Sequence, residues 1–279
     1  MKCSGIADEA GKPIDVQIKA HKELGWDDIE IRNVDGTNLT DVPDEKFEEI
    51  YAKVTEAGMS VSSFASQIAN WSRPVTTDFQ VDIDELKQAI PRMQKFGTQY
   101  IRIMSYPNSE ENPWPDDEWG DEAVRRIGEL AKIAEDGGIV LAHENCSGWA
   151  GHSIENTLAM LERINSPALK LIFDTGNTVS TGQDSFEFYS AVKEHVVHIH
   201  IKDGIKDEEG QRQTFPGEGQ CKVREVVADC KQSGYPGVIS IEPHLASVIH
   251  LAKEADDEKA AYNTYIKYGQ MLNDIVESV

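Results

Sequence analysis

Short apolar segments alternate with longer amphipathic segments along most of the chain. The apolar segments have the length and β-branched composition typical of buried strands, at residues 2–7, 27–33, 59–65, 100–105, 139–145, 169–175, 196–202 and 237–243. Apolar residues at helical spacing follow most of them, for example at 14–25, 84–97, 121–136 and 154–165. Several helical segments end at a glycine suited to a helix C-terminus: Gly25, Gly58, Gly97, Gly137 and Gly234.

Eight such alternating units predict an α/β protein, and their number favours a (β/α)8 TIM barrel over an open doubly wound sheet. The absence of a GxGxxG segment after the first strand further weakens the open-sheet alternative. Residues 257–278 predict a last helix, and no linker divides the chain, so we expect a single domain over residues 1–279. The long loop at 105–121 is either a surface excursion or a lid over the barrel mouth.

Charge excludes some classes of partner. Acidic residues outnumber basic ones 49 to 27, which gives a net charge of −22, and such a surface repels the phosphates of nucleic acids. The chain starts without the apolar core of a signal peptide, and it has no run of apolar residues long enough to span a membrane. These features predict a cytoplasmic protein that binds neither nucleic acid nor membrane.

Acidic residues and a histidine stand at the ends of four predicted strands. They are Glu144, Asp174, His200 and Glu242, and in a barrel of this kind the loops after the strands build the functional site. Three carboxylates and an imidazole suit a divalent cation such as Mn²⁺, Mg²⁺ or Co²⁺, with Zn²⁺ as an alternative. Taken singly, each of these residues also has a purely structural explanation, such as a helix cap, a core histidine or a surface carboxylate. Together they predict one metal site.

The segments "ENCSG", "FDTGN", "HIHIKDG", "FPGEG" and "SIEP", in this order, resemble the xylose-isomerase-like barrel superfamily. The resemblance covers nearly the whole chain, but it is weak for the reaction, because members share one metal site and differ in their loops. It implies that Glu144 and Glu242 bind the metal and also exchange protons with a sugar. The implied activity is metal-dependent isomerisation or epimerisation of a sugar or sugar phosphate through an enediolate.

Other polar positions are candidates for substrate contact. Asn177 stands where related proteins often have histidine and predicts a hydrogen-bond donor. Lys202, near the mouth, predicts either a contact with a substrate oxygen or an ion pair with Asp203 or another neighbour. His198 lies one layer deeper on the same strand face as His200 and either supports the site or is a satisfied core histidine.

Glu30 and Arg32 share a face of the second predicted strand. They either reach sugar hydroxyls across the barrel or form a salt bridge within its wall. The expected partner is a small-molecule sugar, and a homo-oligomer is left open.

Two other functions compete. A lyase similar to inosose dehydratase would use the same metal and glutamates, and a sugar-binding barrel without turnover would bind metal and ligand without proton exchange. The endonuclease branch of the superfamily is disfavoured, because its extra histidines are missing and the net charge of −22 opposes DNA.

Overall fold

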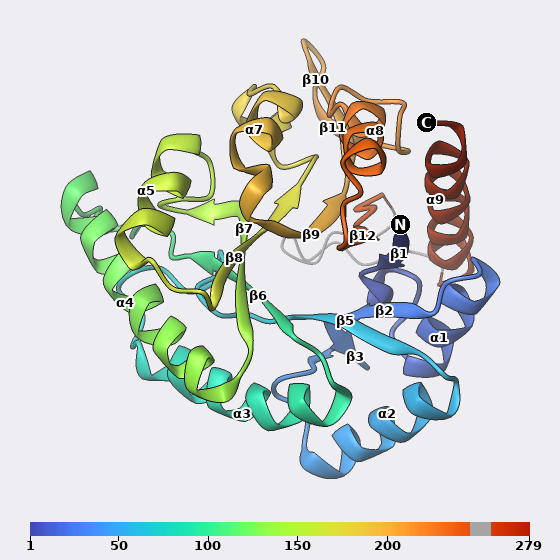
Figure 1. Ribbon diagram of the computed structural model, residues 1–279, viewed down its shortest axis with the longest axis horizontal. Helices are drawn as coiled ribbons and strands as arrows, with labels where there is room; N and C mark the ends of the chain where they lie inside the picture. The colour runs from blue at the N-terminus through green and yellow to red at the C-terminus, as the bar shows by residue number, and fades with distance from the viewer. Residues whose placement is uncertain (246–257) are drawn as a thin grey trace.

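Eight parallel strands form one nearly closed barrel in the computed structural model, which describes residues 1–245 and 258–279 (Figure 1). The barrel strands are β1 (Lys2–Gly5), β2 (Asp28–Ile31), β5 (Ser60–Ala65), β6 (Tyr100–Ser105), β7 (Val140–Gly148), β8 (Leu169–Asp174), β9 (Val196–Ile201) and β12 (Val238–Ile241). Their spatial order is β1-β12-β9-β8-β7-β6-β5-β2, and a bridge between Ile6 and Glu30 lies between the two end strands. The predicted (β/α)8 TIM barrel is confirmed.

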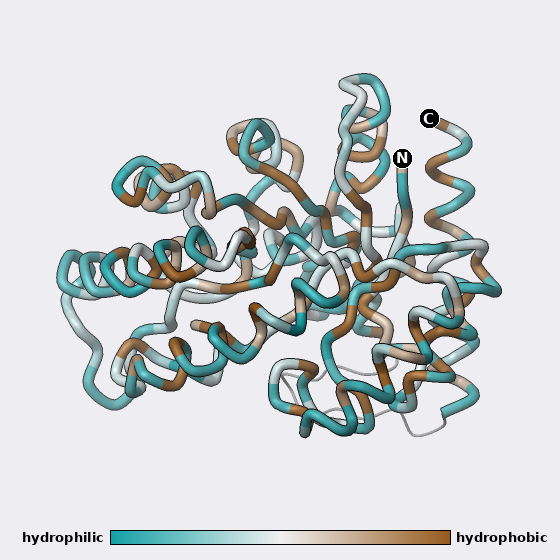
Figure 2. Tube along the Cα trace, turned by 60° about the horizontal axis from the view of Figure 1, so that its bottom comes forward, coloured by the Kyte–Doolittle hydropathy of each residue, from teal (hydrophilic) through white to brown (hydrophobic). Residues whose placement is uncertain are grey.

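Helices surround the barrel, as Figure 1 shows. They are α1 (Ile14–Glu23), α2 (Asp44–Glu56), α3 (Gln80–Phe96), α4 (Asp116–Gly137), α5 (Ile154–Ile164), the short α6 (Thr178–Thr181), α7 (Ser185–Val192), α8 (Val223–Ser233) and α9 (Glu258–Ser278). Along these helices hydrophobic and hydrophilic positions alternate (Figure 2), because one face packs on the barrel and the other meets water. The predicted last helix matches α9, while its first residue, Asp257, lies outside the described residues.

Glycine ends several helices as predicted, with one correction. Gly97 and Gly234 have φ values of +73° and +68°, a left-handed conformation that glycine adopts without steric cost. Helix α4, however, includes Gly137 as its last residue, and its left-handed C-cap is Gly138, with a φ of +66°. Gly137 has a packing role instead, since a Cβ there would lie 2.8 Å from Cδ1 of Ile90 on α3.

Apolar side chains fill the space between the barrel and the helices. Phe173 of β8, for example, is buried and packs against Phe188 and Tyr189 of α7, with ring centroids 5.9 and 5.4 Å apart. With the outer faces of the strands covered in this way, the polar side chains of the strands face the barrel interior. The candidate functional side chains therefore lie in the barrel interior.

Two antiparallel hairpins extend the strand ends and were not predicted. The first pairs β3 (Asn33–Val34) with β4 (Thr37–Asn38), and the second pairs β10 (Asp203–Asp207) with β11 (Gly210–Thr214). The buried Asp203 carboxylate accepts backbone N–H groups of Gly217, Gly219 and Cys221, which fixes the segment after the second hairpin. Among the described residues, the helices include none that is long and apolar enough to cross a membrane.

Candidate metal centre and cavity

The structure brings the four predicted metal ligands together at the ends of the barrel strands. Glu144 lies in β7, Asp174 ends β8, His200 lies in β9 and Glu242 directly follows β12. Asp174 pairs with His200 in the sheet, which places their side chains beside each other. One ligand atom from each of the four residues lies within 4.8 Å of the others, and all four side chains are buried.

The donor set fits a divalent cation. Glu144 Oε2 and Asp174 Oδ2 are buried, and neither accepts a hydrogen bond from the described residues; each has only an ion pair, with Arg102 and Lys202 respectively. Burial, opposed by Lys202 and supported by the nearby Glu242 and Glu144 carboxylates, raises the pKa of Asp174 to about 7. Three oxygen donors and one imidazole nitrogen match the preferences of Mg²⁺, Mn²⁺ or Zn²⁺.

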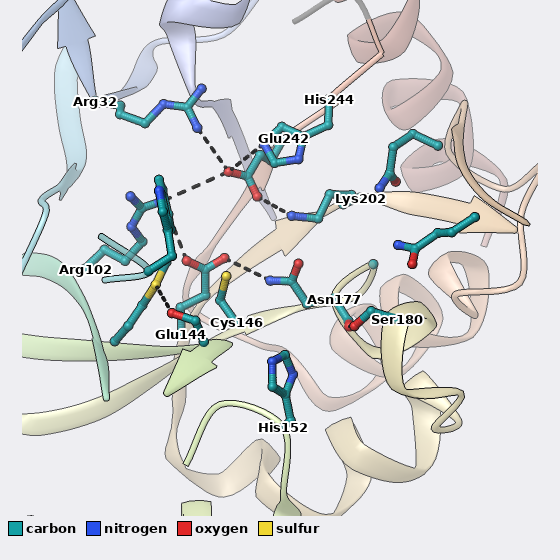
Figure 3. A pocket seen from close by; sticks show the side chains of 16 residues that line it. Arg32, Arg102, Glu144, Cys146, His152, Asn177, Ser180, Lys202, Glu242 and His244 are labelled. Atoms are coloured by element: carbon teal, nitrogen blue, oxygen red, sulfur yellow. Dashed lines mark hydrogen bonds and ion pairs between the residues drawn. The ribbon is translucent and has the colours of Figure 1, made fainter. Parts of the chain in front are cut away.

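Lys202 supplies positive charge to this group of carboxylates. Its Nζ donates to Glu242 Oε2 at 2.6 Å (Figure 3). It also lies 2.9 Å from Asp174 Oδ2, an ion pair without hydrogen-bond geometry. Gly176 gives the lysine side chain room, since a Cβ there would lie 2.5 Å from Lys202 Cγ. Of the two roles predicted for Lys202, the ion pair is present, but its partners are Asp174 and Glu242 instead of Asp203; a substrate contact stays a prediction.

Backbone contacts orient Asp174. Its Oδ1 accepts the N–H groups of Gly176 at 2.7 Å and Asn177 at 2.8 Å, which leaves Oδ2 directed at the ligand group. The Asn177 side chain in turn donates from Nδ2 to Glu144 Oε1 at 3.3 Å. Asn177 is thus a hydrogen-bond donor, as predicted, and in this structure its acceptor is a candidate metal ligand.

Two arginines lie beside the two glutamates. Arg32 Nη1 lies 3.2 Å from Glu242 Oε1, and its guanidinium also pairs with Asp8 and Glu9. Arg102 Nη1 lies 3.6 Å from Glu144 Oε2 (Figure 3). Arg32 thus forms salt bridges with Asp8, Glu9 and Glu242, and its contact with a substrate stays a prediction.

Arg102 was missed by sequence reasoning. The available signal was an arginine inside the apolar strand "YIRIMS", since a buried arginine needs an anionic or carbonyl partner. His244, 3.3 Å from Glu242 Oε1, was also missed. Burial lowers the pKa of His244 to about 4, so its imidazole is neutral near pH 7.

Glu30 and His198 do not reach the cavity as the substrate-contact prediction requires. Glu30 is fully buried, and its Oε2 lies 2.9 Å from His198 Nε2. Glu30 also contacts His200, so both residues lie beneath the candidate metal ligands rather than at the mouth. The physical reason is that the Glu30 carboxylate gains hydrogen bonds from the two histidines in the barrel interior.

A cavity of about 240 Å³ opens above the ligand group. Its lining includes both glutamates, Asn177, Lys202, Arg32, Arg102, His152 and His244, together with Trp71, Gln211 and Gln213. The last three were not identified from the sequence: Trp71 follows β5, and both glutamines lie on the unpredicted β11. No residue of the described segment 105–121 lines the cavity, and its last six residues belong to α4.

The sequence matches a known protein family over most of its length. Residues 18–265 match the model of the xylose isomerase-like TIM barrel family, and the chain belongs to this family. An uncharacterized protein from Methanocaldococcus jannaschii is 34% identical over 123 residues, which are 42% of this chain and 41% of that protein. An inosose dehydratase from Mesomycoplasma hyopneumoniae strain J is 25% identical over 202 residues, 64% of this chain and 67% of the relative.

Solved structures share the fold at low sequence identity. A probable 3-DHS dehydratase from Bacillus anthracis has a TM-score of 0.76 at 15% identity, covering 98% of this chain and 99% of that one. D-psicose 3-epimerase from Clostridium cellulolyticum H10, solved with D-tagatose, has a TM-score of 0.76 at 14% identity and 99% coverage of both chains. A xylose isomerase-like barrel from Mycobacterium smegmatis, solved with magnesium, has a TM-score of 0.69 at 18% identity, covering 99% and 97%.

Proposed function

We propose that this protein is a divalent-metal-dependent enzyme that moves a proton next to the carbonyl group of a sugar or sugar phosphate, as an isomerase or epimerase. The observation that carries the proposal is the position of Glu144 and Glu242, which both line the cavity and both belong to the candidate metal group. The similarity to structures of sugar epimerases and of a magnesium-bound relative supports it.

The residues of the site have different roles in this reaction. A bound Mg²⁺ or Mn²⁺ would supply Lewis-acid stabilisation of negative charge on substrate oxygens. One of the two glutamates removes the proton beside the carbonyl, and the other returns a proton to the opposite face or to the next carbon of the enediolate. Arg32 and Arg102 balance the negative charge of the glutamates, while Asn177, Lys202, Gln211 and Gln213 offer hydrogen-bond donors to hydroxyl groups.

Dehydration is the second candidate. An inosose dehydratase is among the relatives in sequence, and a probable 3-DHS dehydratase is among the structures that share the fold. Proton removal by a glutamate is common to both reactions, and they diverge when a β-hydroxyl leaves instead of a proton returning. The chemistry of the proposed residues is therefore the same up to that step.

Proton exchange with solvent tests the proposal. The Mn²⁺-loaded protein is incubated in D₂O with a panel of ketoses, their phosphates and inososes, and NMR follows deuterium at the substrate carbons. Glu144→Gln and Glu242→Gln, each saturated with Mn²⁺, should lower the exchange rate by about 10²- to 10⁴-fold, because each removes one acid–base group. Full exchange in either variant would refute the two-glutamate mechanism.

The exposed Glu208 offers a matched control, and Glu208→Gln should exchange at the wild-type rate. The product separates the two candidates. An epimerase or isomerase returns a sugar with deuterium at one carbon, whereas a dehydratase yields a new enone or diketone absorbance. A protein that binds metal and sugar without any exchange would be the non-catalytic barrel.

A further inference from the structure

Beneath the candidate metal group, Glu30 forms a closed hydrogen-bonded cluster with residues of two other strands. Its Oε2 lies 2.9 Å from His198 Nε2 and accepts a hydrogen bond from Ser240 Oγ at 2.6 Å. Both of its carboxylate oxygens lie 3.1 Å from Nε2 of His200. All four residues are buried, so water does not compete for these contacts.

The two ring nitrogens of His200 face different partners. Nε2 points to Glu30, while Nδ1 lies 3.2 Å from Glu144 Oε1 and so faces the candidate metal group. An imidazole that donates Nε2–H to a carboxylate directs its Nδ1 to the opposite side, and the carboxylate makes that nitrogen a stronger donor to a cation. The geometry therefore sets which nitrogen is offered to a metal.

We propose that Glu30 is a positioning residue, whose carboxylate holds the Nε2–H of His200 and thereby presents Nδ1 to the cation. This inference rests on the proposed metal-dependent function. A carboxylate that served only to satisfy core polar groups would not need to contact a metal ligand.

Metal affinity gives the first test. Glu30→Gln keeps the size of the side chain and removes its charge, so calorimetric titration with Mn²⁺, without any sugar, should show affinity reduced by about 10- to 100-fold. Ser240→Ala is the matched control, because it removes a hydrogen bond to the same Glu30 Oε2 and leaves the contact with His200 in place. Ser240→Ala should bind Mn²⁺ nearly as well as the wild type. Unchanged affinity in Glu30→Gln, or an equal loss in both variants, overturns the inference.

Nuclear magnetic resonance of the histidine rings gives a readout that does not require metal. With ¹⁵N-labelled histidine, the wild-type protein should show a slowly exchanging Nε2–H of His200 both without metal and with Mg²⁺, and His200→Gln identifies that signal by its loss. In Glu30→Gln the same proton should exchange faster. A wild-type spectrum without a protected Nε2–H on His200 overturns the inference even if the variant does not fold.

These two readouts separate the inference from the proposed function. If the wild-type protein binds no Mn²⁺, the metal-dependent function fails, and the Nε2–H signal of the metal-free protein still decides whether Glu30 holds His200. If Mn²⁺ binds well and Glu30→Gln changes neither affinity nor spectrum, the function stands and the positioning role of Glu30 is overturned.

Discussion

At the scale of single residues, the buried site pairs negatively charged carboxylates with positively charged side chains. The Lys202 ammonium contacts Glu242 and Asp174, and two arginines lie beside the glutamates. Burial alone would lower the pKa of Lys202, but Asp174, Glu242 and Glu144 raise it well above its usual value. Lys202 therefore stays charged and neutralises carboxylates that a metal ion would also neutralise.

Replacement of Lys202 by methionine should test this shared role. Lys202→Met should lower the unfolding free energy of the metal-free protein by about 3–5 kcal/mol, because it leaves buried carboxylates without a counter-charge. Saturating Mn²⁺ should reduce the difference in unfolding free energy between Lys202→Met and the wild type, since the ion restores positive charge. Urea unfolding with Mn²⁺ and with EDTA measures both effects. The exposed Lys206 provides the control variant Lys206→Met. If Mn²⁺ left the difference in unfolding free energy between Lys202→Met and the wild type unchanged, Lys202 and the ion would not share this role.

At the scale of elements, buried side chains join helices to the barrel. His21 of α1 lies fully buried, with Nδ1 2.9 Å from Gln17 O and Nε2 3.2 Å from Gly5 O of β1. Tyr265 of α9 also reaches His21 Nε2, at 3.3 Å. This single imidazole therefore links the first strand with the first and last helices.

The His21 contact predicts a dependence of stability on pH. Burial lowers the pKa of His21 from 6.5 to about 4, so the folded protein keeps the ring neutral while the unfolded chain takes up a proton. Stability from this residue is complete above pH 6.5 and falls as the pH decreases toward 4. Between about pH 7 and pH 5 the loss should be roughly 2 kcal/mol.

Urea unfolding at the two pH values measures this loss, with His21→Gln as reference because glutamine does not titrate. The variant should lose roughly 2 kcal/mol less than the wild type over the same interval. Equal losses in both proteins would show that other groups cause the acid sensitivity.

The elements differ in how well the sequence predicts them. Barrel strands such as "LKLIFD" are mostly apolar, and polar residues at the ends of four of them are the candidate ligands, so both the strands and this group were predictable. The β10–β11 hairpin was not, because its residues are mostly polar and lack an apolar alternation. Gln211 and Gln213 were missed for that reason.

The partners of inward-facing side chains were also beyond the sequence. Strand alternation places Glu30, Arg102 and His198 in the barrel interior, but it does not tell which residue of another strand each one meets. Glu30 pairs with residues 168 and 170 positions away in the chain, and such contacts depend on the stagger of the strands in the closed barrel. This stagger decides whether an inward-facing carboxylate reaches the cavity or lies beneath it.

At the scale of the whole molecule, the net charge of −22 attracts cations everywhere on the surface. This attraction is long-ranged, and salt at about 0.15 M screens it beyond about 8 Å. The candidate metal group is buried in the barrel, where screening is much weaker. Specific binding at this group is therefore separable from general attraction by the salt concentration.

Metal removal should consequently lower stability in a site-specific way at physiological salt. An ion that binds only the folded protein adds about 2.7 kcal/mol when its concentration is 100 times its Kd, so Mn²⁺ should raise the thermal unfolding temperature and EDTA should reverse the rise. Asp174→Asn keeps most of the surface charge but removes one ligand, and it should lose most of the Mn²⁺-dependent rise in differential scanning calorimetry. If the variant and the wild type were stabilised equally, the ion would be acting through the surface charge, and the four residues would not form its binding site.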